Sequence, residues 1–413
     1  GSGKTTFAEA MAYEGKVIDR RGTIENGTTL SDNTDLERTN QRSIYSTILY
    51  TEFMDHKLNI IDAPGSDDFS GCLFSASMVA DVGLMLFNAQ NGFEVGSEIQ
   101  SRYAETYKVP LIGVINQLDH EKANWENTME SIAAFSKVKP VIVQYPVNPG
   151  PHFDAFIDVL LMKMFRFKDE NGTREELPIP AEEAERAAEL HHALLEAAAE
   201  NDEGLMDLYF EKGDLETNDI RKGLGMGIAN RDWMPIFCAS AKRDIGTKRV
   251  MEFVINVAPN PDQRPPLLDV EGKPVLADAS APTVLFVFKS TIEQHVGEIS
   301  YFRVVRGKVT EGMELMNTRT DNKEKISQLF AVAGKSRTKV SEMVAGDIGC
   351  TVKLKSTRTG DTLAAVGTHV VLPPMNFPDP PYRPAVPPPH TPHPAKPGHT
   401  LNQPHSEAPT TTA

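Results

Sequence analysis

The stretch PLIGVINQLD, residues 110–119, joins a continuous apolar run to an Asn-Gln-Leu-Asp turn. A run this apolar suits a strand that is buried on both faces of a parallel sheet. Further apolar runs lie at residues 82–87, 140–145 and 234–238, separated by stretches that include helical patterns. Strands that alternate with helices indicate a doubly wound, mostly parallel α/β domain. We therefore expect functional loops at the carboxyl ends of these strands.

The segments around this sheet have patterns of their own. Residues 46–53 alternate, residues 58–61 are apolar, and together they predict a hairpin. Residues 20–45 are polar and contain several Gly, Ser and Asn residues, which predicts a long loop. Helices are expected over residues 7–17, 181–200 and 248–257.

The chain opens on Gly3-Lys4-Thr5, the second half of a phosphate-binding loop, G-x-x-x-x-G-K-[ST]. The first Gly of that motif would lie before residue 1. Gly3 lets backbone N–H groups approach a phosphate, Lys4 reaches the β- and γ-phosphates, and the Thr5 hydroxyl can bind Mg²⁺. The helix that follows adds its positive end.

A second motif, LNIIDAPG at residues 58–65, ends an apolar strand in Asp62. A carboxylate at this point suits Mg²⁺, usually through a water molecule. The Gly65 amide can then meet a γ-phosphate. Taken alone, the same letters also describe a β-turn built from Asp and Pro-Gly.

Residues 116–119 fit the guanine-reading pattern N-K-x-D, with Gln117 in place of Lys. Asp119 would accept hydrogen bonds from N1 and N2 of guanine, which adenine cannot satisfy, and Asn116 would tie the loops together. The Ser240-Ala241 backbone, after another strand, could donate to guanine O6. Four motifs in this order are hard to explain as ordinary turns. The predicted GTP/GDP site comprises Gly1, Ser2, Gly3, Lys4, Thr5, Thr6, Asp62, Ala63, Pro64, Gly65, Asn116, Gln117, Asp119, Ser240, Ala241 and Lys242, with Thr5 and Asp62 on the metal.

Charge and cysteine content limit the classes of function. The net charge of the 413 residues is −15, and residues 169–220 carry 17 acidic and three basic side chains. A chain this acidic should not coat bare nucleic acid unaided. The acidic block is either a solvated helical face or a docking surface for a basic protein. Three distant cysteines indicate no disulfide framework and suit a reducing cytoplasm, and no apolar run reaches the ~18 residues of a membrane span.

Beyond these motifs, the sequence resembles elongation factor G, the ribosomal translocase GTPase, from residue 1 to about Pro381. The matching segments are residues 107–110, residues 194–200 with Leu208-Tyr209, residues 301–304, 345–348, 359–363 and 375–378. The resemblance implies a P-loop G domain with an inserted subdomain, an all-β translation-factor barrel, and three further domains. It also implies a monomeric cytoplasmic factor that acts on the ribosome and, indirectly, on tRNA and mRNA. In the family the insertion meets a ribosomal stalk protein.

The resemblance also gives expected domain boundaries. Residues 1–265 form the G domain, which lacks its first strand, with an acidic insertion at about 166–232. Residues 266–282 form a linker and residues 283–372 the barrel. Residues 373–413 are rich in Pro and His and predict a disordered tail, whose His390, His393, His399 and His405 could bind a metal only loosely. We expect a partial sequence that ends in a shifted reading frame, or else a genuine Pro-rich tail.

Three residues depart from the family pattern. Ser66 occupies the position of the His that orients the attacking water, and Ser is too short to stand where an imidazole would. Tyr45 occupies the position of a Mg²⁺-binding Thr, and Gln117 replaces Lys. With Ser66 and Lys4 at the catalytic positions, we expect a translation factor that hydrolyses GTP slowly. The alternatives are a non-hydrolysing, GTP-dependent ribosome-binding switch and a ribosomal-protection protein; the acidic insertion argues against the latter.

Overall fold

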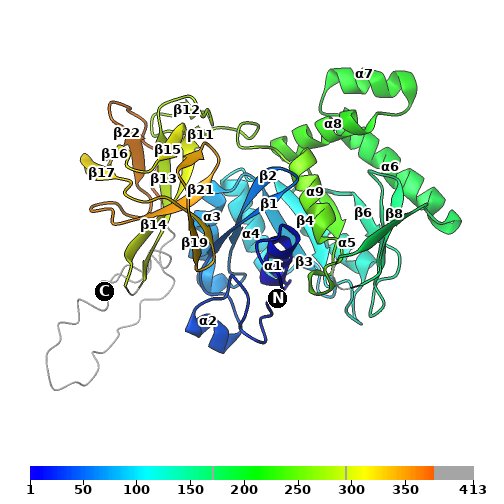
Figure 1. Ribbon diagram of the computed structural model, residues 1–413. Helices are drawn as coiled ribbons and strands as arrows, with labels where there is room; N and C mark the ends of the chain where they lie inside the picture. Colours follow the sequence, from blue (N-terminus) through cyan, green and yellow to red (C-terminus); the bar gives the residue numbers. More distant parts are fainter. Residues whose placement is uncertain (170–171, 294, 376–413) are drawn as a thin grey trace. The chain divides into compact units, whose positions relative to one another are not determined.

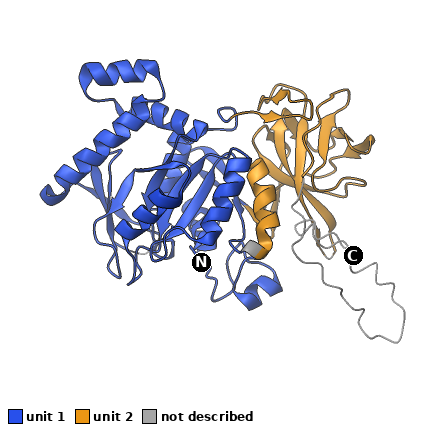
Figure 2. Ribbon diagram, turned by 180° about the vertical axis from the view of Figure 1, so that it is seen from behind, with its two compact units in different colours: residues 1–43, 49–67, 80–264 blue, residues 44–48, 68–79, 265–413 orange. Residues whose placement is uncertain are grey.

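The computed structural model describes residues 1–169, 172–293 and 295–375. It divides into two compact units, shown in different colours in Figure 2. Unit 1 comprises residues 1–43, 49–67 and 80–264, and unit 2 comprises residues 44–48, 68–79 and the chain from residue 265 onward. The tail histidines predicted as loose metal ligands lie outside the described residues.

Unit 1 is built on a four-stranded parallel sheet of order β3-β4-β10-β5. Figure 1 labels two of its strands, β3 and β4. The predicted doubly wound α/β arrangement is confirmed, because the apolar runs at 82–87, 110–115 and 234–238 form adjacent strands. The sheet consists of β3 (Gly83–Asn88), β4 (Leu111–Asn116), β10 (Trp233–Cys238) and β5 (Lys139–Ile142). Unit 1 also contains the helices α1 (Lys4–Glu14), α4 (Val95–Thr106), α5 (Trp125–Phe135) and α9 (Thr247–Val257).

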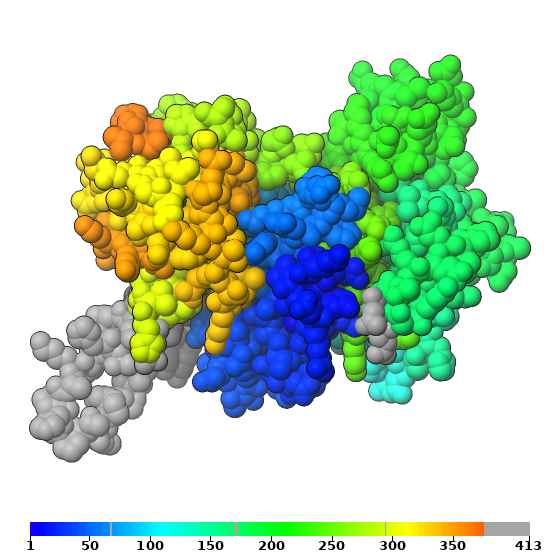
Figure 3. Space-filling view, in the orientation of Figure 1, coloured from blue at the N-terminus to red at the C-terminus, as the bar shows by residue number. Residues whose placement is uncertain are grey.

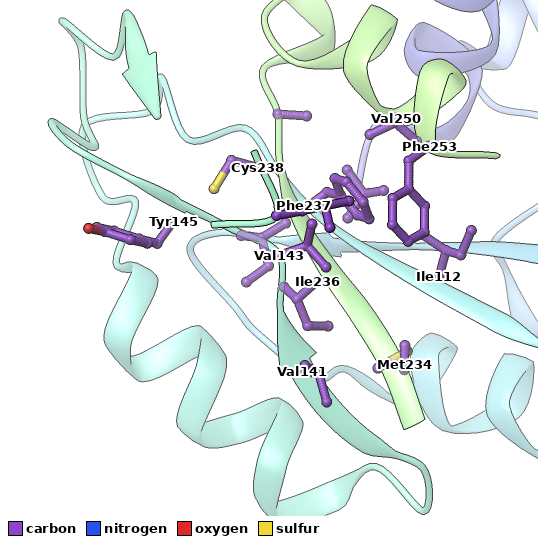
Figure 4. Packing of buried hydrophobic residues seen from close by; sticks show 14 of the residues in the cluster. Ile112, Val141, Val143, Tyr145, Met234, Ile236, Phe237, Cys238, Val250 and Phe253 are labelled. Atoms are coloured by element: carbon purple, nitrogen blue, oxygen red, sulfur yellow. The ribbon is translucent and has the colours of Figure 1, made fainter. Parts of the chain in front are cut away.

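The core of unit 1 lies between this sheet and its helices. Phe237 of β10 meets Phe253 of α9 edge to face, with ring centroids 4.7 Å apart (Figure 4). Ile112 and Ile236, on neighbouring strands, are fully buried in the same cluster. Burial of an aliphatic or aromatic side chain contributes about 1.5–3 kcal/mol, so this cluster fixes the strand ends that carry the polar loops.

The predicted hairpin forms β1 (Thr47–Phe53) and β2 (His56–Asp62). Its turn places Met54 and Asp55 at positive φ, +48° and +58°, as a tight two-residue hairpin turn requires. The two strands form a sheet of their own, separate from the four-stranded sheet. The preceding polar region is not wholly loop: α2 (Asp35–Asn40) is a short helix closed by a Thr34–Glu37 capping box, too short for periodicity to reveal.

The apolar run at 140–145 was predicted as one strand, and this was wrong. The chain leaves the parallel sheet after Ile142, and Gln144 begins a four-stranded antiparallel sheet. The buried Gln144 side chain explains the change, since its amide donates to Asp158 (3.0 Å) and accepts from the Cys238 N–H (3.2 Å), so it bridges both sheets. The second sheet comprises β6 (Gln144–Pro146), β7 (Ala155–Asp158), β8 (Lys163–Phe167) and β9 (Arg174–Leu177).

Three helices follow this sheet before the chain returns to β10. They are α6 (Ala184–Ala199), preceded by the short 3-10 turn η2 (Ala181–Glu183), α7 (Glu203–Lys212) and α8 (Thr217–Asn230). In the space-filling view these segments, in green, stand out at one end of unit 1 (Figure 3). Their acidic side chains are largely exposed. The excursion between β5 and β10 thus begins near Gln144. The acidic insertion at about residues 166–232 stays a prediction.

Unit 2 is an all-β antiparallel domain that also includes two short segments from earlier in the chain, residues 44–48 and 68–79. Its main sheet has the order β17-β16-β22-β13-β14-β21-β18-β19, in which the long strands β13 and β14 are central. Helix α3 (Ser70–Val79), after the 3-10 turn η1 (Asp67–Phe69), contacts β13. The strands are β11 (Leu267–Leu268), β12 (Pro274–Val275), β13 (Val284–Glu293), β14 (Gly297–Arg306), β15 (Lys308–Thr310), β16 (Glu314–Asn317), β17 (Asn322–Lys325), β18 (Phe330–Ala333), β19 (Ser336–Lys339), β20 (Glu342–Val344), β21 (Ile348–Val352) and β22 (Thr362–Ala365).

Two buried cations hold the short segments within unit 2. Lys289 of β13 donates to the Ser46 carbonyl, and Arg303 of β14 donates to the Val79 carbonyl. All three cysteines, Cys72, Cys238 and Cys350, are free and buried. Across the described ranges, no helix combines the length and apolar character needed to cross a membrane.

Candidate functional site

Asn116 lies at the centre of the part of the predicted nucleotide site that would bind the guanine base, which we call the base end. It is the last residue of β4 and only 1% exposed. Its Nδ2 donates to the Ser2 carbonyl and its Oδ1 accepts from the Ala241 N–H, both at 2.9 Å. Adjacent parallel strands end at the same edge of a sheet, which is why β4 and β10 bring these loops together. Asn116 therefore joins the opening loop, its own loop and the loop after β10.

Gly3 lies where this junction meets helix α1. Its φ of +80° is in the left-handed region, which glycine adopts at little cost. A Cβ at Gly3 would lie 2.6 Å from Asn116 Nδ2, so a larger residue would displace the junction. The first-turn N–H groups of α1, including those of Lys4, Thr5 and Thr6, follow directly and form an anion-binding end.

Gln117 and Asp119 complete the loop after β4. Gln117 adopts φ +63°, and its Nε2 donates to the Gly1 carbonyl at 3.1 Å. The substituted residue thus contacts the opening loop through an amide instead of an ammonium group. Asp119 is half-buried, and its carboxylate makes no hydrogen bond to other residues that the structure describes. It is a free acceptor at the base end.

The Ser240-Ala241 backbone differs from the expected donor pair. The Ser240 N–H donates to Ile245 O (3.0 Å), and the Ala241 N–H donates to Asn116 Oδ1 (2.9 Å). The Ser240 N–H is therefore bonded within the tight turn into η3 (Ala241–Arg243), and the Ala241 N–H is bonded within the Asn116 junction. The next backbone N–H, that of Lys242, has no acceptor in the described part of the chain and is the available donor.

Thr5 and Asp62 meet in the part of the predicted site that would bind the phosphates and Mg²⁺, which we call the phosphate end. Thr5 Oγ1 donates to Asp62 Oδ2 at 2.8 Å and lies 3.1 Å from Ser43 Oγ. Burial raises the pKa of Asp62, and hydrogen bonds from Ser31 and Thr5 oppose the shift. Burial likewise lowers the pKa of Lys4, against the nearby Asp62 charge. The Thr5 hydroxyl and the Asp62 carboxylate are oxygen ligands of the kind that Mg²⁺ prefers, so these two residues fit the predicted metal.

The turn after β2 brings residues 62–65 beside Lys4. A Cβ at Gly65 would collide with Lys4 Nζ, so the ammonium group occupies the space that glycine leaves. Ala63 is half-buried and Pro64 is buried, and both shape this turn. Lys4 is thereby held between Asp62 and Gly65, at the place where a phosphate would bind.

Ser66 is paired with an arginine from the first loop. Arg42 Nη2 donates to Ser66 Oγ. The hydroxyl that the structure places beside Thr5 belongs to Ser43, while Tyr45 lies in the 44–48 segment of unit 2. A role for Tyr45 on the metal stays a prediction.

Sequence reasoning missed two buried acids near the phosphate end. Glu9 of α1 is 2% exposed, and its carboxylate accepts from the Gly22 and Leu30 N–H groups, each at 2.8 Å. Asp32 is 3% exposed, and burial raises its pKa to about 6, with Ser43 lowering and Asp62 raising it. Among the described residues no group of three or more His, Cys, Asp or Glu side chains could hold a metal, and Mg²⁺ commonly uses one or two carboxylates with phosphates.

Comparison with known proteins agrees with this geometry. Residues 1–260 match the family described as Elongation factor Tu GTP binding domain, and residues 282–366 match Elongation factor G domain 2. A crystal structure of a protein from Thermus thermophilus superposes with a TM-score of 0.83 at 27% sequence identity. The match covers 92% of this chain and 55% of that one, so the chain spans about half the length of that protein.

Proposed function

We propose that this chain, which belongs to the elongation factor G family of translational GTPases, binds GTP and GDP with Mg²⁺ and acts on the ribosome to promote movement of tRNA and mRNA. The observation that carries the proposal is the Asn116 junction, which holds the opening loop and the loop after β10 at 2.9 Å each. Beside that junction, the unpaired Asp119 carboxylate presents the acceptor that guanine requires.

The phosphate end supplies binding and orientation. Lys4 and the first-turn N–H groups of α1 would hold the phosphates. Thr5 and Asp62, already 2.8 Å apart, would hold the metal directly or through water. When bound, Mg²⁺ neutralises charge on the β- and γ-phosphate oxygens. All of these residues would serve binding, and Ser66 is not among them.

Hydrolysis should be slow, because Ser66 cannot orient water as an imidazole would. Its hydroxyl is short and is engaged by Arg42. Loss of one positioning group commonly lowers a rate by about 10²–10³-fold. The same pair supports the second candidate, a switch whose state follows GTP occupancy alone.

The acidic helices α6, α7 and α8 would provide a docking surface for a basic ribosomal protein. Exposed acids lie along α6 and α7 and just before α8, at Glu185, Glu189 and Glu196 of α6, at Glu203, Asp207 and Glu211 of α7, and at Glu216, which precedes α8. Opposite charge on a partner speeds encounter and is screened by salt. This part of the proposal predicts ribosome binding that weakens as ionic strength rises.

Two measurements test the proposed function. Titration with GTP, GDP and ATP should show binding of the guanine nucleotides and little binding of ATP. Ribosome-stimulated hydrolysis should be slow in the unmodified protein and in Ser66→Ala, and about 10²–10³-fold faster in Ser66→His. Rapid hydrolysis by the unmodified protein would contradict the weakened-hydrolysis proposal and direct attention to Arg42. ATP preference would contradict the role of Asp119.

A further inference from the structure

Arg21 connects the polar loop at residues 20–45 to the loop that follows β10. Its Nη1 donates to the Ala241 carbonyl and to the Lys242 carbonyl, at 3.1 Å each. These partners lie 220 and 221 residues further along the chain. Arg21 belongs neither to the phosphate-binding motif nor to the guanine-reading motif. The proposed function therefore leaves this long-range contact unexplained.

Helix α1 holds Arg21 in place. Glu9 and Tyr13 lie four residues apart on α1 and therefore share one face of the helix. The Arg21 guanidinium carbon lies 5.6 Å from the centroid of the Tyr13 ring, within the range of a cation–π contact. The next residue, Gly22, donates its N–H to the buried Glu9 carboxylate at 2.8 Å. The guanidinium group is thus positioned before any ligand binds, which lowers the entropic cost of its bonds to the loop after β10.

The Ala241 carbonyl and the Lys242 N–H belong to the same peptide unit. The two groups of a trans peptide unit point in opposite directions. Arg21 and the Asp244 N–H, at 3.1 and 3.3 Å, hold the carbonyl oxygen, so the Lys242 N–H is directed away from both. The preceding N–H groups, of Ser240 and Ala241, are already bonded within the protein. Arg21 therefore fixes the direction of the donor that this loop still has available.

We propose that Arg21 is a positioning residue for guanine recognition: by holding the Ala241 carbonyl, it aims the Lys242 N–H at the O6 carbonyl of the bound base. The proposal rests on the proposed function, since it requires guanine at the base end. A hydrogen bond from a cation also polarises the shared peptide unit and strengthens its N–H as a donor. Asp119 would read the N1 and N2 donors of guanine and Lys242 its O6 acceptor, so the two loops would recognise different atoms of one base.

Positioning of a donor differs in its consequences from a general effect of charge or folding. Burial raises the pKa of Asp244, and the positive charge of Arg21 opposes that shift. Loss of this charge would disturb the loop after β10 for every nucleotide alike. Loss of positioning would instead weaken only nucleotides that present a good acceptor at position 6 of the base. The preference between two such nucleotides therefore separates the two roles.

The first test compares the affinities for GDP and 6-thio-GDP, in which sulfur, a weaker acceptor, replaces O6 while the N1 and N2 donors are kept. Arg21→Met removes the guanidinium group, and Arg20→Met, at the exposed neighbouring position, is the matched control. We expect the unmodified protein and Arg20→Met to prefer GDP by about 10-fold, and Arg21→Met to lose most of this preference through weaker GDP binding. An unchanged preference, or an equal loss of affinity for both nucleotides, would overturn the proposal.

A second measurement observes the donor itself. Amide signals are recorded by NMR in protein that carries isotope-labelled lysine, and the Lys242 signal is identified by its loss in Lys242→Arg. Saturating GDP should shift this signal strongly in the unmodified protein and in Arg20→Met, and much less in Arg21→Met. The same shift in all three proteins would contradict positioning by Arg21. Failure of the unmodified protein to bind GDP in the presence of Mg²⁺ would instead contradict the proposed function.

Discussion

The base end and the phosphate end of the site are built differently. At the base end, Asn116 joins three loops through two hydrogen bonds of 2.9 Å. At the phosphate end, Asp32 and Asp62 are buried carboxylates, the charge of Asp62 adds to the burial that raises the pKa of Asp32, and Ser66 contacts Arg42. The Asn116 junction at the base end forms without a ligand, whereas the phosphate end contains buried carboxylates whose charge a bound cation would help to balance. We infer that recognition of guanine is preorganised while the phosphate end depends on its metal.

The largest expected effect is a loss of guanine-nucleotide affinity, caused by a substitution at the base end. Asp119→Asn replaces the acceptor for guanine N1 and N2 by an amide, whose NH₂ group would face those donors. We expect GTP and GDP affinity to fall by about 10⁴-fold and xanthosine nucleotides, which carry a carbonyl at that position, to bind instead. Competition binding with GDP and XDP measures both changes.

The matched control for this substitution is Asp154→Asn, a partly exposed acid of the same unit. It should leave both affinities unchanged. Retention of GDP binding in Asp119→Asn would place guanine recognition elsewhere. The phosphate end would then carry most of the affinity, contrary to the comparison.

A smaller effect tests whether the junction is structural. Asn116→Ala leaves the Ser2 carbonyl and the Ala241 N–H without partners in a buried position. We expect the free energy of unfolding to fall by about 2–4 kcal/mol, measured by denaturant titration without nucleotide. Asn91→Ala, at an exposed position, should change it little. Equal stability of the two variants would mean that the base end is not preorganised.

The two ends also differ in how far the sequence could predict them. Asn116, Asp119 and Asp62 could be found because each follows an apolar run whose buried strand places it at one edge of the sheet. Asp32 could not, because an acid in a polar loop has no periodicity, and the loop that contains it is held by a bond from the Leu30 N–H to Glu9, 21 residues earlier in the chain. The use of the Ser240 and Ala241 N–H groups within the protein was equally invisible, since a motif shows which donors exist and not which are already bonded.

The division of the run at 140–145 has a related cause. Val141, Val143 and Tyr145 are all buried, so hydrophobicity alone describes one continuous strand. Only the Gln144 side chain, bonded to both sheets, marks the point where the chain changes sheet. A single buried amide in an apolar run is a weak signal, because such groups also occur within one sheet when they find partners.

The smallest expected effect concerns the support of the base end. Glu14, in the last turn of α1, and Asp244, just after η3, both approach Gly172: a Cβ there would lie 2.6 Å from Glu14 Oε1 and 3.4 Å from Asp244 Oδ2. Burial and the Asp244 charge raise the pKa of Glu14 from 4.5 to about 7. The folded protein therefore holds a proton that the unfolded chain releases. Its free energy of unfolding should fall as pH rises from about 4.5 to about 7, by about 1–3 kcal/mol.

Glu14→Gln removes the titrating group and should abolish that part of the pH dependence. At pH 8 the variant should be more stable than the unmodified protein, because the ionised Glu14 is gone, and near pH 4 the two should agree. Denaturant titrations at several pH values provide the measurement, with Glu25→Gln, at an exposed position, as the control. If the free energy of unfolding of Glu14→Gln kept the same slope against pH as the unmodified protein between pH 4.5 and 7, repulsion between Glu14 and Asp244 would not contribute. The base end would then lack the unbalanced charge that distinguishes the phosphate end.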